Sequence, residues 1–216
     1  MKLYLDTASL TEIKKYAEYG FIDGVTTNPA LAAKEGLGAS KITERITEIC
    51  EVVAGLVSIE VYATTFEEML VEGRKYSTIA PNIVIKLPTT TDGLRACKVL
   101  TGEDIKTNMT LVFSPTQARM AAKMNATLVS PFVGRVEDAL FDGLELIAKI
   151  REIYDNYNFE TKILAASFRS VKQISQVAQI GADIATISPE LLGKLSQHPF
   201  TDKGLADFLA KANSVK

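Results

Sequence analysis

The sequence contains few of the residues on which metal sites, disulfide scaffolds and nucleic-acid interfaces depend. Its 216 residues include one histidine, His198, two cysteines, Cys50 and Cys97, and no tryptophan. One histidine gives no metal-site spacing, and the cysteines lack C-x-x-C spacing, so we expect no metal and packed thiols of a reducing compartment. The 24 basic residues are balanced by 26 acidic ones, which predicts neither a nucleic-acid nor a membrane partner.

Long apolar runs and nucleotide-binding motifs are absent as well. No run approaches the about 18 apolar residues of a membrane-spanning helix, and residues 1–6 lack the basic-then-apolar pattern of a signal peptide. The sequence has no G-x-G-x-x-G and no Walker motif, so no dinucleotide or ATP site is implied. We therefore expect a cytoplasmic protein that needs no cofactor.

What the sequence does contain is a repeated alternation of strand-like runs with helix-like patterns, which is typical of βα units and a parallel sheet. Eight strands are predicted, at residues 2–6, 24–28, 56–62, 82–87, 105–111, 127–133, 162–167 and 183–188. Eight strands, each followed by a helix, in a single domain of residues 1–216 predict an α/β fold, a compact TIM (β/α)8 barrel. A doubly wound open sheet is the alternative.

Helix boundaries are predicted from capping residues. Gly20 and Gly181 should end helices, and Ser188-Pro189 should begin one. Capping boxes are expected at four pairs: Ser9 and Glu12, Thr65 and Glu68, Ser114 and Gln117, and Ser170 and Gln173.

The barrel should occupy residues 1–200 and be followed by an extra C-terminal helix at residues 201–216. Leu205, Phe208 and Leu209 fall on one face of this helix. Apart from the exterior of the barrel, no part of the chain is left to cover that face. We expect it to pack either on the exterior of the barrel or on a neighbouring subunit.

Lys86 is the most informative residue, because it stands at the end of the β-branched run Ile83-Val84-Ile85. Such a run reads as a strand that is covered on both faces. Burial favours an uncharged amine, which can attack a carbonyl and form a Schiff base, an electron sink that lets a neighbouring C–C bond break. The alternative is that Lys86 extends from the strand end into solvent.

The ends of the other predicted strands are mostly polar, and in a TIM barrel the chemistry takes place at these ends. They supply carboxylates, amides, hydroxyls and guanidinium groups, a set that suits carbonyl chemistry on a phosphorylated sugar. Besides Lys86, these residues are Asp6, Thr26, Asn28, Glu60, Asn108, Thr110, Ser130, Phe132, Arg135, Ser167 and Arg169.

Several of these residues also have a simpler, structural interpretation. Asp6 and Asn28 could cap or form turns, instead of acting as an acid/base and a substrate ligand. Glu60 could form a charge pair with Lys86 across adjacent strands, instead of activating water.

Arg135 and Arg169 also have two possible interpretations. Ser167 and Arg169 immediately precede a helix start at Ser170, where an anion binds readily, and Arg135 could add a forked donor to the same phosphate. The alternative for the arginines is a surface salt bridge, which is common and weak.

Four blocks, spread along nearly the whole chain, resemble the small single-barrel transaldolases and the similar fructose-6-phosphate aldolases. They are Leu3-Tyr4-Leu5-Asp6-Thr7-Ala8, Gly24-Val25-Thr26-Thr27-Asn28-Pro29, Ile83-Val84-Ile85-Lys86-Leu87-Pro88 and Leu164-Ala165-Ala166-Ser167-Phe168-Arg169. The resemblance implies a Schiff base on Lys86, with Asp6 as acid/base, and it implies that Glu60 and Thr110 position the catalytic water. The residues expected to bind substrate are Thr26, Asn28, Asn108, Ser130 and Phe132, with Arg135, Ser167 and Arg169 at the phosphate.

Two positions distinguish the branches of this family. The aldolase branch carries glutamine and tyrosine where this sequence has Glu60 and Phe132, so the resemblance implies a transaldolase. The expected reaction moves a dihydroxyacetone unit between sugar phosphates in the pentose phosphate pathway. A fructose-6-phosphate aldolase and a non-catalytic phosphosugar-binding barrel are the alternatives. The resemblance also implies a ring-like homo-oligomer, a pentamer or decamer, whose C-terminal helices reach neighbouring subunits.

Overall fold

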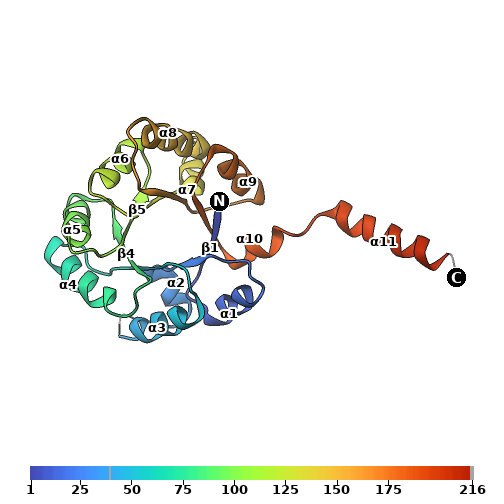
Figure 1. The fold of residues 1–216 in the computed structure, drawn as a ribbon, viewed down its shortest axis with the longest axis horizontal. Coiled ribbons are helices and arrows are strands. Elements are labelled where there is room, and N and C mark those ends of the chain that lie inside the picture. The colour runs from blue at the N-terminus through green and yellow to red at the C-terminus, as the bar shows by residue number, and fades with distance from the viewer. Residues whose placement is uncertain (39, 215–216) are drawn as a thin grey trace.

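A computed structural model describes residues 1–38 and 40–214 and shows a closed barrel of eight parallel strands (Figure 1). Each strand pairs with its neighbours in chain order, and β1 closes the ring by pairing with β8. The TIM barrel is therefore confirmed, and the open sheet is excluded. The strands are β1 (Lys2–Asp6), β2 (Gly24–Thr26), β3 (Val57–Glu60), β4 (Ile83–Pro88), β5 (Thr107–Val112), β6 (Leu128–Pro131), β7 (Lys162–Ala165) and β8 (Ile184–Ile187).

The described residues form eleven helices, two more than the eight barrel helices and one C-terminal helix that were predicted. The unpredicted ones, α2 and α7, are only six residues long, too short for a helical period to show in the sequence. No helix in the described part of the chain is long and apolar enough to cross a membrane. The helices are α1 (Leu10–Glu18), α2 (Pro29–Lys34), α3 (Ile42–Val52), α4 (Phe66–Ser77), α5 (Thr91–Gly102), α6 (Pro115–Lys123), α7 (Val133–Asp138), α8 (Gly143–Asn156), α9 (Val171–Ile180), α10 (Pro189–Lys194) and α11 (Pro199–Asn213).

Between the strands and the surrounding helices lies one large apolar core. Ile13, Ile46 and Ile150 are fully buried there, on the inner faces of α1, α3 and α8. Cys97 lies in the same core, and burial raises the pKa of its thiol to about 11. Cys50 is half-buried, and burial likewise raises its pKa to about 11, so both cysteines are packed free thiols, as predicted.

One of the four predicted capping boxes is complete. Ser170 Oγ accepts a hydrogen bond from Gln173 N, and Gln173 Oε1 accepts one from Ser170 N at 3.1 Å. Ser114 Oγ accepts from Gln117 N, but Gln117 Oε1 accepts from Phe113 N instead of closing the box.

The other two boxes were predicted wrongly. Neither Ser9 nor Thr65 makes a side-chain cap hydrogen bond, although each is the residue before its helix. The Thr65 hydroxyl instead donates a hydrogen bond to Glu68 Oε2 at 2.7 Å.

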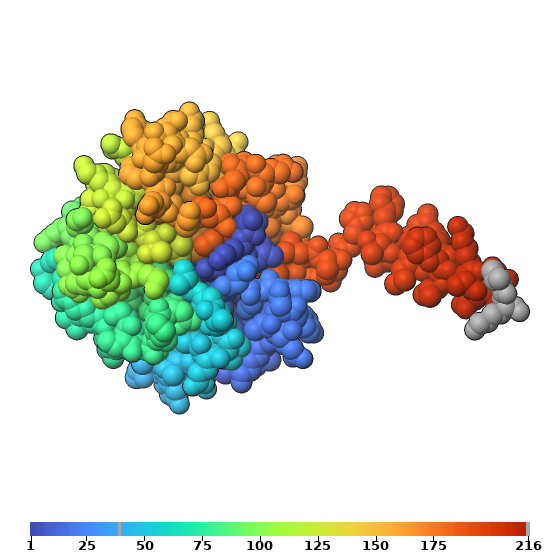
Figure 2. Space-filling model, viewed as in Figure 1, coloured from blue at the N-terminus to red at the C-terminus, as the bar shows by residue number. Residues whose placement is uncertain are grey.

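The extra C-terminal helix is confirmed, but α11 begins at Pro199 and not at residue 201. His198 caps it, since its Nδ1 accepts a hydrogen bond from Phe200 N at 3.2 Å. Residues 215–216 of the predicted helix lie outside the described residues. Helix α11 projects away from the barrel (Figures 1 and 2) and buries none of its residues. The predicted apolar face is exposed, so the exterior of the chain's own barrel does not cover it.

Candidate active site

The interior of the barrel carries an apolar layer and, above it, a mostly polar layer. Successive residues of a strand point to opposite faces, so residues two apart share a face. The apolar layer is a buried cluster that includes Tyr4, Val84, Leu128, Leu164 and Ile184. Two residues further along the same chain stand Asp6, Lys86, Ser130, Ala166 and Thr186, which line one cavity. Strand alternation therefore puts the polar side chains at the carboxyl end of the barrel.

Lys86 is buried and paired. It is 5% exposed, its Nζ lies 3.0 Å from Glu60 Oε2, and it donates a hydrogen bond to Thr27 O at 3.1 Å. The pair forms because Glu60 and Lys86 occupy the same register on adjacent strands. Lys86 thus does not extend into solvent, and the charge pair that we considered for Glu60 is present. A carboxylate in direct contact can also take the proton that the ammonium must lose before the nitrogen becomes a nucleophile.

Asp6 is held by a chain of two threonine hydroxyls. Thr26 Oγ1 donates to Asp6 Oδ1 at 2.7 Å, and the hydroxyl oxygens of Thr26 and Thr186 are 2.6 Å apart. Because a hydroxyl carries one proton, Thr186 is the donor in the second bond. Thr186 was not predicted, although it follows Ile184 by two residues as Lys86 follows Val84. These two hydrogen bonds hold the carboxylate of Asp6 on the wall of the cavity.

A second group of polar side chains lies beside Lys86. Ser130 Oγ donates to Asn108 Oδ1 at 2.8 Å, and Asn108 Nδ2 donates to Ser58 Oγ at 3.3 Å. Thr110 follows Asn108 by two residues on β5, and its buried hydroxyl has no hydrogen-bond partner among the described residues. An unpaired buried hydroxyl costs about 1–3 kcal/mol, so a water contact at Thr110, which the resemblance implies, would satisfy it.

The cavity at this end of the barrel has a volume of about 340 Å³. It is lined by nine of the twelve predicted site residues: Asp6, Thr26, Asn28, Lys86, Ser130, Phe132, Arg135, Ser167 and Arg169. The other three do not line it: Glu60 contacts Lys86, Asn108 contacts Ser130, and Thr110 follows Asn108 by two residues on β5. Residues of the lining that the sequence did not predict are Leu31, Lys34, Ala166, Phe168, Thr186 and Ser188.

Asn28 is both a helix cap and part of this wall. Its Oδ1 accepts a hydrogen bond from Leu31 N at 2.9 Å and so begins α2, with Pro29 at the first helical position. The structural interpretation of Asn28 is correct. It does not compete with substrate binding, because the cap uses the side-chain oxygen and leaves the amide nitrogen.

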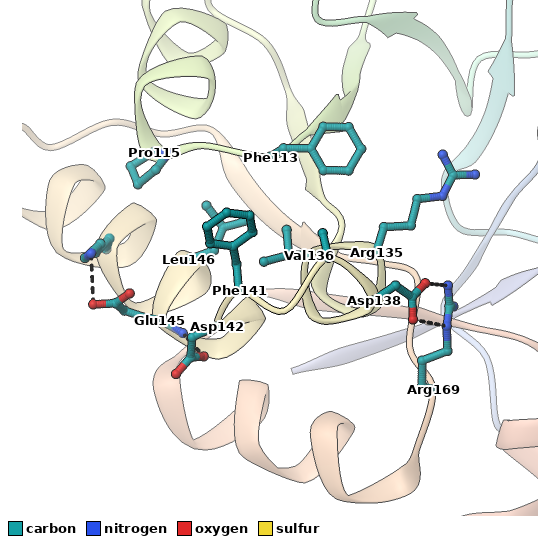
Figure 3. Close-up of a pocket in the computed structure, with 12 residues that line it drawn as sticks. Phe113, Pro115, Arg135, Val136, Asp138, Phe141, Asp142, Glu145, Leu146 and Arg169 are labelled. Atoms are coloured by element: carbon teal, nitrogen blue, oxygen red, sulfur yellow. Dashed lines mark hydrogen bonds and ion pairs between the residues drawn. The ribbon is translucent and has the colours of Figure 1, made fainter.

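The predicted phosphate corner consists of Arg135, Ser167 and Arg169, and its donors are mainly side chains and not the backbone amides at the start of α9. Gln173 Oε1 accepts from both Arg169 N, at 2.7 Å, and Ser170 N, so these amides are already engaged. Arg169 pairs through Nε and Nη2 with Asp138, at 3.3 and 2.6 Å (Figure 3), and its Nη1 lies near Ser167 O and Oγ. The salt-bridge alternative is thus realised for Arg169. Because Nη2 carries two protons and donates one to Asp138, its second proton can still bind an anion.

Arg135 extends from α7, and its guanidinium stacks 5.1 Å from the ring centroid of Phe132. It belongs to none of the ion pairs between described residues. Arg135 and Arg169 also line a larger cavity of about 790 Å³ (Figure 3), whose walls include Phe141 and Leu146. Two guanidinium groups thus stand at one side of the barrel mouth.

Comparison with known proteins identifies the family of this chain. The family model described as Transaldolase/Fructose-6-phosphate aldolase matches residues 3–215. The chain belongs to this transaldolase and fructose-6-phosphate aldolase family. Curated relatives named "Probable transaldolase" from Caulobacter sp. (strain K31) and Chelativorans sp. (strain BNC1) are each 54% identical and cover 97% of this chain and 95% of theirs. One from Brucella ovis is 53% identical, with the same coverage.

A solved structure supports the fold of this transaldolase and aldolase family member independently. A mandelate oxidase mutant with a monooxide FMN adduct superposes with a TM-score of 0.60, over 96% of this chain and 70% of that chain. The two sequences are 13% identical, so the likeness shows the barrel and nothing of the reaction.

The predicted phosphate corner depends on a glycine in α7. Gly134 N donates to Ser167 O at 2.8 Å, and a Cβ on Gly134 would lie 1.9 Å from that oxygen and 3.0 Å from Arg169 Cγ. We expect Gly134→Ala to lower the free energy of unfolding by about 1–3 kcal/mol and to weaken phosphate binding, because Ser167 and Arg169 must move. Urea unfolding and titration with inorganic phosphate measure the two effects.

The control is Gly102→Ala at the end of α5. A Cβ there meets no atom within 4 Å, so the free energy of unfolding should rise by up to about 1 kcal/mol, because alanine restricts the unfolded chain, and phosphate binding should not change. Equal behaviour of the two variants would show that the contact of Gly134 with Ser167 does not shape the corner.

Proposed function

We propose that this chain is a transaldolase that transfers a dihydroxyacetone unit through a Schiff base on Lys86, as a step of the pentose phosphate pathway. The donor is a ketose phosphate, sedoheptulose 7-phosphate or fructose 6-phosphate. The acceptor is an aldose phosphate, glyceraldehyde 3-phosphate or erythrose 4-phosphate. The observation that carries the proposal is a buried lysine, 3.0 Å from a carboxylate, at a cavity lined by an aspartate, hydroxyls and arginines.

The first step forms the imine. Glu60 takes a proton from the Lys86 ammonium, and the free amine adds to the C2 carbonyl of the ketose to give a carbinolamine. Glu60 returns the proton to the departing hydroxyl, so water leaves and a protonated Schiff base stands opposite a carboxylate again. Thr110 has the unpaired hydroxyl that could hold this water.

The second step breaks the carbon chain. Asp6 takes the proton of the C4 hydroxyl, the C3–C4 bond breaks, and its electrons move into the iminium to give an enamine on Lys86. The aldose leaves, an acceptor aldehyde enters, and the same steps run in reverse. The hydroxyls of Thr26 and Thr186 keep Asp6 oriented throughout.

The remaining predicted residues bind the substrate in this proposal. Asn28 and Ser130 supply an amide and a hydroxyl for the sugar hydroxyls, and Asn108 acts through Ser130, whose hydroxyl it holds in place. Arg135, Ser167 and Arg169 supply donors for the phosphate, and Arg is well suited to this because its fork matches phosphate oxygens. A cytoplasmic location is part of the proposal and is supported by the two free thiols.

An assay with and without acceptor separates transaldolase from aldolase. A transaldolase consumes fructose 6-phosphate only when an aldose phosphate is added, an aldolase releases dihydroxyacetone alone, and a non-catalytic barrel does neither. We expect acceptor dependence, because Phe132 lines the cavity without a hydroxyl that could protonate the enamine.

Phe132→Tyr tests the same idea in one protein. The added hydroxyl should raise acceptor-independent release of dihydroxyacetone at least about tenfold, by supplying a general acid. Phe113→Tyr is the control, since Phe113 packs on Phe132 with centroids 5.6 Å apart but does not line the barrel cavity. Equal release from both variants would exclude this role for residue 132.

We also propose a homo-oligomer, a pentamer or decamer by resemblance, in which α11 packs on a neighbouring subunit. The support is its uncovered apolar face, where Leu205, Phe208 and Leu209 are 59%, 71% and 56% exposed. Leu205→Asp with Phe208→Asp should lower the molar mass in light scattering, because burying two carboxylates is unfavourable. Lys203→Asp, on the opposite face of α11, should leave the mass unchanged. If the double variant keeps the full mass, α11 is not the contact.

A further inference from the structure

Besides Lys86, which is paired with Glu60, three cations from three different segments line the barrel cavity, and the sequence predicted only two of these three. Arg135 comes from α7, after β6, and Arg169 follows β7. The third, Lys34, is the last residue of α2, after β2. In a closed ring of eight strands β2 and β6 are four strands apart, so Lys34 stands across the mouth from Arg135.

Helix α2 fixes the position of the Lys34 backbone at the cavity. The cap by Asn28 and the proline at the first helical position set the start of the helix, and Leu31 and Lys34 are then three residues apart on one face. Both line the cavity, whereas Ala32, between them, is buried against the barrel core. Lys34 therefore faces the cavity because the fold of α2 places it there.

The charge at the mouth is not balanced by its neighbours. Among the described residues no ion pair involves Lys34 or Arg135, and Glu35, next to Lys34, lies 3.9 Å from Arg45 instead. Arg169 pairs with Asp138 at the rim. The one carboxylate that lines the cavity, Asp6, is bonded to Thr26. Apart from Lys86 and its partner Glu60, three cations thus face a cavity lined by a single carboxylate, which raises the local concentration of anionic ligands.

We propose that Lys34 is a specificity-determining residue that binds the substrate phosphate from the side of the mouth opposite Arg135 and Arg169. The cavity of about 340 Å³ is at the small end for a ligand site, so one phosphate at its mouth lies between cations on both sides. The ammonium on its flexible stem acts as a movable point charge, complementary to the two forked guanidinium groups. This role rests on the proposed function, because it concerns sugar phosphates in the same site.

Lys34→Gln tests the role through a ratio. With saturating donor, kcat/KM is measured for glyceraldehyde 3-phosphate and for unphosphorylated glyceraldehyde as acceptors. The ratio of the two should fall about fivefold in Lys34→Gln, the upper range for a solvent-exposed charge contact, and the fall should shrink at high salt. Lys34→Arg should keep most of the ratio. Lys41→Gln, a nearby exposed lysine that does not line the cavity, should keep all of it.

A second measurement needs no turnover. Titration of the whole protein with inorganic phosphate, by calorimetry, should show weaker binding to Lys34→Gln than to the parent protein and to Lys41→Gln. If the parent protein transfers nothing but this difference holds, the proposed reaction is wrong and the role of Lys34 in phosphate binding stands. If Lys34→Gln matches the parent in the kinetic ratio or in phosphate affinity, the inference about Lys34 is overturned.

Discussion

Lys86→Met should lower turnover by at least about 10⁴-fold, because it removes the buried amine that forms the imine in the proposed reaction, and loss of a nucleophile is among the largest single effects in an enzyme. Borohydride added together with fructose 6-phosphate should leave a reduced adduct on the peptide that carries Lys86, detected by mass mapping. The same treatment of Lys86→Met should leave that peptide unmodified. Lys98→Met, on the outer helix α5, should react as the parent protein does.

The fold of Lys86→Met needs its own measurement, because the substitution leaves the Glu60 carboxylate partly buried without its partner 3.0 Å away. Breaking one side of a buried pair costs about 3–5 kcal/mol in the free energy of unfolding. Lys86→Met with Glu60→Gln removes both charges and should recover most of that loss in urea unfolding. A folded double variant that still turns over substrate, or still forms the adduct elsewhere, would show that Lys86 is not the nucleophile.

The polar layer of the barrel could be predicted from the sequence because its cause is local. Lys86 follows Val84, and Asp6 follows Tyr4, by two residues, and strand geometry alone turns such pairs to one face. Once the strands are read as a barrel, their polar ends meet at one mouth. The same rule could have found Thr186 two residues after Ile184, had the last strand been read as closely as the fourth.

Other parts of the site depend on contacts that no local pattern encodes. The bond between Thr26 and Thr186 exists only because β1 closes the ring with β8 and brings both hydroxyls toward Asp6. Lys34 enters the cavity from α2, which is too short to show a helical period.

The wrong capping box at Thr65 also depends on a side-chain contact that residue spacing does not encode. The spacing of Thr65 and Glu68 fits a box, but the hydroxyl bonds to the carboxylate itself. The sequence also could not show that Asp138 is the salt-bridge partner of Arg169, because Asp138 lies on α7, a helix that was not predicted.

Asp6→Asn should separate the two halves of the reaction. We expect kcat to fall by about 10²–10⁴-fold, the contribution of a general acid/base, because an amide cannot take the C4 hydroxyl proton. Thr26 can still donate to the side-chain oxygen of asparagine, so the fold should persist, and Lys86 with Glu60 should still form the imine.

The borohydride adduct decides between this role and a structural one. Asp6→Asn should give as much reduced adduct on Lys86 as the parent protein while releasing almost no aldose, because the reaction stops after imine formation and before C–C cleavage. Asp104→Asn, in an exposed turn that tolerates asparagine at φ 59°, is the matched control and should behave as the parent in both assays. Loss of the adduct together with turnover would mean that Asp6 supports the lysine or the fold and does not move the C4 proton, whereas full turnover would remove it from the mechanism.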